Sequence, residues 1–187
     1  MDHFMNPRNV GELEIPDGHS EVGSPQCGDA MTLDIQVDNN DTITDIRFQT
    51  FGCAGAIASA SALTELAKGK TLADARKIKN SEVAAYLGGM PPEKYHCSVM
   101  GHEALTEAIN DFTRRRDQTR DQIEEVISDM PVELKQLLGS NTISIEHVHP
   151  GRVQIGHINN ESQKIAEILE KEFHNRFGST VEVRITG

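Results

Sequence analysis

The sequence has no hydrophobic run long enough to span a bilayer, which argues against a transmembrane protein. Residues 1–10 also lack the apolar core and the basic cluster of a secretory signal peptide. Neither an internal repeat nor a low-complexity tract is present. The 187 residues therefore predict a soluble cytoplasmic protein, with one globular domain or two small ones.

Positive charge is in short supply. The chain has 18 Lys and Arg against 29 Asp and Glu, and its formal net charge is −11. Both halves are acidic, and the only basic run is Arg114-Arg115-Arg116, which fits the end of a solvated helix. Nucleic-acid binders carry a basic surface, so nucleic acid is not expected as a partner.

Cysteine is scarce as well. There are three cysteines, all within the first 97 residues, and no two of them form a C-x-x-C pair. An odd number in a cytoplasmic protein argues against a disulfide framework and raises the expectation of metal or redox chemistry.

Two kinds of hydrophobic periodicity define the first part of the chain. Residues 31–38 and 42–50 alternate apolar and polar side chains, which predicts two strands joined as a hairpin by the turn residues 39–41. Helical spacing follows the second strand. It predicts helices over 56–69, 71–79, 81–89 and from about Ser98 to Arg116.

The second part begins after the polar stretch 117–122, which we take as the domain boundary, although a continuous helix through it is equally compatible with the pattern. We expect a helix that Pro131 breaks, two strands, a long helix and a last strand. The prediction is an α+β protein. Residues 1–116 form one domain, and residues 117–187 form a small α-β-β-α-β domain.

The first two cysteines lie at predicted element ends. Cys27 and Asp29 are two residues apart before a strand, so in extended chain their side chains point the same way. Gly28 between them lets the backbone approach a ligand. Cys53 stands between glycine-flanked residues where a strand gives way to a helix, and a helix N-terminus favours a thiolate.

The third cysteine follows a histidine. His96 and Cys97 are adjacent, and neighbours in mid-helix diverge, whereas at the irregular start of a helix they can converge. Pro91-Pro92 stiffens the preceding loop. Thiolates suit zinc, copper(I) and iron–sulfur centres, and imidazole suits zinc and iron.

Permanent iron–sulfur clusters usually have four cysteine ligands. Three cysteines with a carboxylate and an imidazole would hold a cluster without locking it, as a carrier does. Taken singly, each cysteine is equally well explained as a small buried hydrophobe. The residues alone therefore leave packing and metal binding as alternatives.

The local sequences resemble the iron–sulfur cluster scaffold family of the IscU type, which includes the N-terminal domain of NifU. The resemblance rests on DHFMNPRNVGEL, SPQCGDAM, FGCAGAIASAS and MPPEKYHCSVMGHEALTEAI and covers about residues 2–113. It implies an antiparallel sheet of about three strands packed against helices. It also implies a scaffold rather than an enzyme.

By this resemblance, the ligands of a transient [2Fe-2S] cluster and its iron would be drawn from Cys27, Asp29, Cys53, His96 and Cys97. Cys97 would accept persulfide sulfur from a cysteine desulfurase. Asp29 would make the cluster labile, and Asp29 and His96 are alternative fourth ligands.

The partners implied are the desulfurase, an electron donor such as ferredoxin, and apo iron–sulfur acceptor proteins. The cluster would lie within one chain or between two chains of a homodimer. Members of the family offer a loop, typically LPPVK, to an Hsp70-type chaperone. Here the loop is Met90–Lys94, and its acidic Glu93 counts against that recognition.

Two other functions compete. A zinc-binding sulfur acceptor of the SufU kind would use the same thiolates, and a protein of either kind can carry zinc when isolated. SufU proteins have an insertion before the third motif and lack the histidine, so His96 favours the IscU type. A cysteine hydrolase using Cys97, His96 and Asp29 leaves the other cysteines unexplained.

The second domain faintly resembles the C-terminal domain of NifU, which binds a cluster through a C-x-x-C motif. HINNESQKI stands at that place, so the resemblance implies that the metal function has been lost. His147, His149 and His157 are better explained as exposed strand histidines than as metal ligands, and His102 as a surface or packing residue.

Overall fold

The structure is a computed structural model that describes residues 2–24, 28–91, 95–132, 135–136, 144–156 and 160–186. The chain divides into two compact units, Met1–Phe112 and Thr113–Gly187. No helix in the described part of the chain combines the length and the apolar character needed to cross a membrane.

The first unit is built on an antiparallel sheet with the strand order β1-β2-β3. Its strands are β1 (Gly18–Ser24), β2 (Asp29–Val37) and β3 (Ile43–Phe51). The predicted hairpin is therefore confirmed. Strand β1 was not predicted from its residues, because GHSEVGS has one large apolar side chain and shows no clear alternation.

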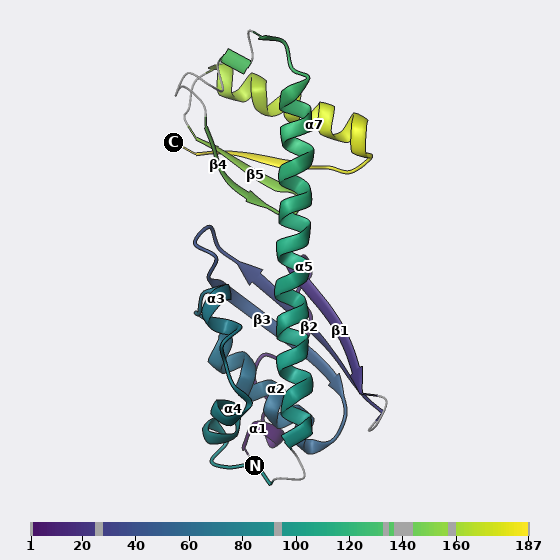
Figure 1. Cartoon of the computed structure of the whole chain (residues 1–187), viewed down its shortest axis with the longest axis vertical. Helices are drawn as coiled ribbons and strands as arrows, with labels where there is room; N and C mark the ends of the chain where they lie inside the picture. Colours follow the sequence, from purple (N-terminus) through teal and green to yellow (C-terminus); the bar gives the residue numbers. More distant parts are fainter. Residues whose placement is uncertain are drawn as a thin grey trace. The chain divides into compact units, whose positions relative to one another are not determined.

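Helices cover one face of this sheet (Figure 1). They are α1 (Asp2–Met5), α2 (Ala54–Ala67), α3 (Leu72–Ala75), α4 (Asn80–Tyr86) and the start of α5 (Tyr95–Ser128). Strand residues such as Leu33 and Phe48 meet helix residues such as Leu63, Leu105 and Phe112, all of them 0–1% exposed. Each such burial contributes about 1.5–3 kcal/mol, so this layer holds the unit together.

The segment before β1 is fastened to the sheet and to α2. The Gly11 amide donates to the Phe48 carbonyl at 2.9 Å, along the outer edge of β3. The Leu13 amide then donates to the carboxylate of Asp34 at 3.0 Å. Further back, the hydroxyl of Ser61 on α2 lies 2.8 Å from Nδ1 of His3. These contacts fix the segment that leads into the sheet.

The second unit has its own sheet, in which β4 (Ser144–His149) pairs antiparallel with β5 (Arg152–Gly156), and β5 pairs parallel with β6 (Glu182–Thr186). Its core contains Val153 and Ile155 from the sheet, with Leu169 and Phe173 from α7 (Asn160–Phe177). The helix that connects β5 to β6 is what allows those two strands to run parallel. The predicted α-β-β-α-β order is confirmed.

Helix α5 is continuous from Tyr95 to Ser128. The polar stretch 117–122, predicted as a boundary between domains, lies inside this helix, and the division between the compact units falls after Phe112. Polar composition alone does not end a helix, and this stretch has no glycine or proline to do so. Pro131 follows the helix end, as expected.

Candidate functional site

The ends of β2 and β3 bring two of the five predicted site residues together. Ala30, the second residue of β2, pairs with Phe51, the last residue of β3. Asp29 therefore lies opposite Gly52, the residue before Cys53. A Cβ placed on Gly52 would be 2.9 Å from Cγ of Asp29 and 3.1 Å from its Oδ2. The carboxylate thus packs against the backbone that leads to Cys53, and only a glycine leaves room for it.

Cys53 occupies the N-cap position of α2, with an extended backbone (φ −73°, ψ 166°). Its carbonyl oxygen accepts from the Ala56 amide at 2.9 Å and begins the helix. Its side chain is half-buried and packs against the core of the first unit. Cys53 forms no disulfide with any other described residue. The positive end of α2 favours the thiolate form at this position.

The first cysteine motif is described only after Cys27, which lies outside the described residues. Gly28 adopts a left-handed backbone conformation (φ +69°). Side chains with a Cβ rarely adopt it, so glycine is needed for the chain to turn into β2 at Asp29. This turn sets the direction from which the segment containing Cys27 leaves the sheet.

The third motif lies at the start of α5. His96 and Cys97 are the second and third residues of the helix, which begins three residues before the predicted start. Their side chains are outside the described part, as are residues 92–94 of the loop before them. Both residues are in the first turn, where backbone amides lack helical partners and the helix dipole favours a thiolate.

Among the described side chains, no group of three or more His, Cys, Asp and Glu is placed to hold a metal ion. The structure therefore brings Asp29 together with the Cys53 loop. Convergence of Cys27, His96 and Cys97 on the same point stays a prediction.

Comparison with known proteins decides the family. The profile of the NifU-like N terminal domain matches residues 1–119, which contain the whole first unit. The chain belongs to the NifU-like N-terminal domain family. The family predicted from the cysteine motifs is confirmed.

Relatives of this NifU-like domain are scaffolds by name. The "Iron-sulfur cluster assembly scaffold protein IscU 1" of Archaeoglobus fulgidus is 53% identical over 126 residues, 67% of this chain and 81% of the relative. The IscU scaffold protein of Rickettsia prowazekii is 47% identical, over 65% of this chain and 94% of its own. The mitochondrial "Iron sulfur cluster assembly protein 1" of Yarrowia lipolytica is 50% identical, over 62% and 65%.

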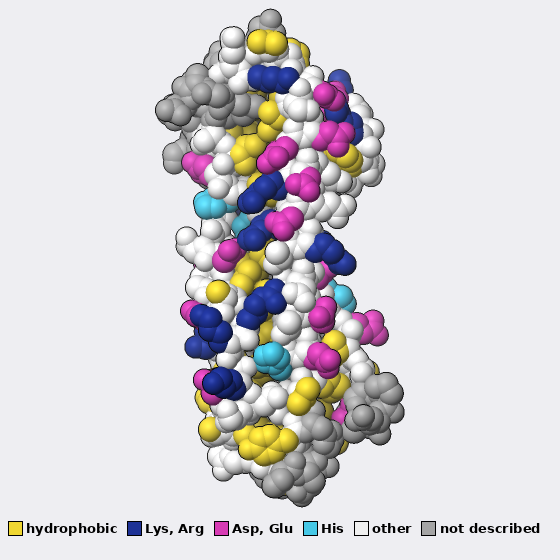
Figure 2. Space-filling view, in the orientation of Figure 1, with side chains coloured by type: hydrophobic (Ala, Val, Ile, Leu, Met, Phe, Trp, Pro, Cys, Tyr) yellow, Lys and Arg dark blue, Asp and Glu magenta, His cyan; other side chains and the backbone are white. Residues whose placement is uncertain are grey.

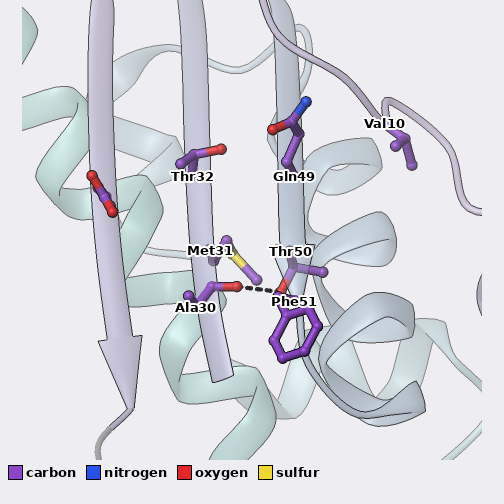
Figure 3. Close-up of a pocket in the computed structure, with 8 residues that line it drawn as sticks. Val10, Ala30, Met31, Thr32, Gln49, Thr50 and Phe51 are labelled. Atoms are coloured by element: carbon purple, nitrogen blue, oxygen red, sulfur yellow. Dashed lines mark hydrogen bonds between the residues drawn. The ribbon is translucent and has the colours of Figure 1, made fainter. Parts of the chain in front are cut away.

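A shallow hollow of about 490 Å³ adjoins the corner of Asp29 and Gly52 in the NifU-like domain. Figure 3 shows it on the sheet, with Thr50 donating to the Ala30 carbonyl at 2.8 Å and Phe51 at the end of β3. Phe51 is 81% exposed. Sequence reasoning missed this residue, although alternation with the buried Phe48 predicts that Phe51 points outward.

The histidines of the second unit do not form a described metal site. His147 is half-buried and His149 is buried, and His157 lies outside the described residues. The prediction that these are exposed strand histidines is therefore wrong for His149, which is 5% exposed. Its position on β4, opposite Arg152 of β5, gave no sequence signal of burial.

Proposed function

We propose that this chain is a scaffold on which a labile [2Fe-2S] cluster is assembled and from which it is transferred to acceptor proteins. The proposed ligands are Cys27, Cys53 and Cys97, with Asp29 and His96 as alternative donors at the remaining position. The observation that supports this most is the Asp29 carboxylate packed against the backbone before Cys53, within a domain whose relatives are named as scaffolds.

Sulfur would arrive by thiol–persulfide exchange. The Cys97 thiolate attacks the outer sulfur of a persulfide on a cysteine desulfurase, the sulfur–sulfur bond breaks, and the desulfurase thiolate leaves. Two electrons from a donor such as ferredoxin then reduce the new persulfide to sulfide and regenerate the Cys97 thiolate. Iron is bound by the thiolates, which are favoured ligands for iron in clusters.

The carboxylate gives the site its lability. An oxygen donor is a harder and weaker partner for cluster iron than a thiolate, so a site that includes Asp29 binds the cluster less tightly than four cysteines would. This suits a protein that must give its cluster away.

Anaerobic reconstitution of the full chain with iron(II) and sulfide tests the scaffold function. We expect equal amounts of bound iron and sulfide with the visible absorbance of a [2Fe-2S] cluster. Native mass measurement shows whether one chain or a homodimer holds it. Zinc that stays bound and blocks cluster formation would overturn the proposal in favour of a zinc-binding sulfur acceptor.

The Asp29→Ala variant tests the lability. We expect its cluster to persist longer than in the wild type, measured as decay of visible absorbance, because the weak oxygen donor is gone. Asp121→Ala, which removes an exposed carboxylate from α5, is the matched control and should decay like the wild type. Equal or faster decay in Asp29→Ala would contradict the role of the carboxylate.

Desulfurase transfer is tested by mass spectrometry of the chain after reaction with a cysteine desulfurase and free cysteine. One added sulfur on the peptide that contains Cys97 is expected, and none after Cys97→Ser. Sulfur on the Cys27 or Cys53 peptide alone would assign the acceptor role to another residue.

A further inference from the structure

Positive charge in this acidic chain is concentrated in one short segment. Residues 68–79, KGKTLADARKIK, contain five of the 18 Lys and Arg residues and only one of the 29 Asp and Glu residues. The remaining residues contain 13 cations against 28 acidic side chains. The segment includes α3 and belongs to the first unit, so a local basic surface stands on a strongly acidic molecule.

Part of this segment lines a cleft of about 290 Å³, formed with the start of α4 and with α5. We call it the basic cleft, and its lining residues are Arg76, Lys77, Ile78, Lys79, Asn80 and His102. Figure 2 shows dark blue side chains grouped on this side of the first unit, near a cyan histidine. None of the proposed cluster ligands lines the cleft.

The cations of the basic cleft are incompletely neutralised. Arg76 donates to the neutral amide oxygen of Asn110 at 2.7 Å rather than to a carboxylate. Lys77 pairs with Asp74 at 2.8 Å, but both side chains are more than half exposed, so the pair is weak. No ion pair joins Lys79 to a described carboxylate, although its amide donates to Glu82.

An acceptor inside the cleft also lacks a partner. The side-chain oxygen of Asn80 is shielded from solvent and has no hydrogen-bond donor among the described residues. A buried polar atom left in this way is unfavourable, and a bound group can relieve it by supplying a donor. The cleft thus offers cations to an anionic surface and an acceptor to a neighbouring amide.

We infer that the basic cleft is a docking surface for a protein partner that presents clustered Asp and Glu side chains. Potentials of opposite sign across an interface give specificity and speed association. A nucleic acid fits less well, since its extended polyanionic backbone would meet the acidic surface that surrounds the small cleft. A lone phosphate fits less well too, because Lys77 and Lys79 are exposed and point charges in water bind it weakly.

The docking surface lies close to the third cysteine motif. His102 follows Cys97 by five residues on α5, a distance of about 7.5 Å along the helix axis at about 1.5 Å per residue. A partner in the basic cleft would therefore sit beside the start of α5. The inference does not depend on the scaffold function, because it uses none of the cluster ligands.

Binding of a dye-labelled octaglutamate peptide to the full chain, followed by fluorescence anisotropy, tests the inference. The test variant is Lys77→Gln/Lys79→Gln, in which both side chains are exposed and the Arg76 contact remains. The matched control is Lys164→Gln/Lys171→Gln, which removes two exposed charges from α7. Circular dichroism confirms that both variants are folded.

We expect the test variant to bind octaglutamate about three- to tenfold more weakly than the wild type, as the loss of two exposed ion pairs implies. The control should match the wild type. Affinity should fall as salt rises from about 20 to 200 mM, because screening shortens the reach of exposed charges. An octaglutamine peptide should not bind.

Equal weakening in the test and control variants would overturn the inference, because binding would then follow net charge rather than the basic cleft. Failure of octaglutamate to bind the wild type at low salt would overturn it as well. Pyrophosphate or a thymidine octanucleotide is assayed in parallel. Tighter binding of either one, lost in the test variant, would replace the acidic protein with that ligand.

Discussion

A methyl group at position 52 would separate Asp29 from the Cys53 loop without removing any proposed ligand. The Cβ of Gly52→Ala would lie 2.9 Å from Cγ of Asp29 and 3.1 Å from the Cβ of Ala56. Gly52 is not among the glycines with positive φ, so an alanine backbone is acceptable there. The perturbation is therefore purely steric.

The size of the displacement follows from contact distances. Carbon atoms are comfortable at about 3.5–4.0 Å, so the carboxylate must retreat by roughly 1 Å. The carboxylate ends a rotatable side chain, which keeps the loss of folding stability near about 1 kcal/mol, the low end for overpacking. Metal–ligand distances tolerate only about 0.2 Å, so the same shift removes Asp29 from a site built around Cys53.

We expect Gly52→Ala to lengthen the life of the reconstituted cluster in the same direction as Asp29→Ala, measured by decay of visible absorbance, with a urea midpoint close to the wild type. Gly23→Ala is the control, since its Cβ would meet Asp29 only at the backbone oxygen, at an ordinary 3.7 Å. Wild-type decay in Gly52→Ala, alongside slow decay in Asp29→Ala, would refute the reasoning.

Three further substitutions probe the first unit. Gly18→Ala would drive a Cβ to within 2.3 Å of a backbone oxygen of α5, so we expect a loss of about 3 kcal/mol or more in urea unfolding, and a near-normal midpoint would contradict the packing of β1 on α5. Asp34→Ala removes the buried acceptor of the Leu13 amide and should cost about 1–3 kcal/mol; hydrogen exchange at Leu13 should accelerate, and unchanged protection would count against the contact. Burial, helped by the charge of Arg8, lowers the pKa of His3, so docking of α1 should be complete above the ordinary histidine pKa of about 6.5 and weaken as the pH falls through it. NMR titration of the His3 ring tests this, and a pKa at or above the ordinary value would disprove it.

Local patterns predicted much of the secondary structure because each depends on a few neighbouring residues. Alternation in 31–38 gave β2, and the glycines around Cys53 gave its place between a strand and a helix. Strand β1 escaped because its stability comes from pairing with β2 and from packing on α5, neither of which shows in its own residues. The boundary at 117–122 was misplaced for a related reason, since composition does not reveal whether a helix continues.

The sequence by itself determined the family, through four motifs whose residues and order are specific, and the α+β class, through periodicities of two and 3.6 residues. Only the tertiary structure decided that Asp29 lies against Gly52, 23 positions further along the chain, because strand register sets which residues face each other. It also decided that the cations of residues 76–79 share a cleft with His102 of α5. Such meetings depend on how elements distant in sequence pack, and no local pattern encodes them.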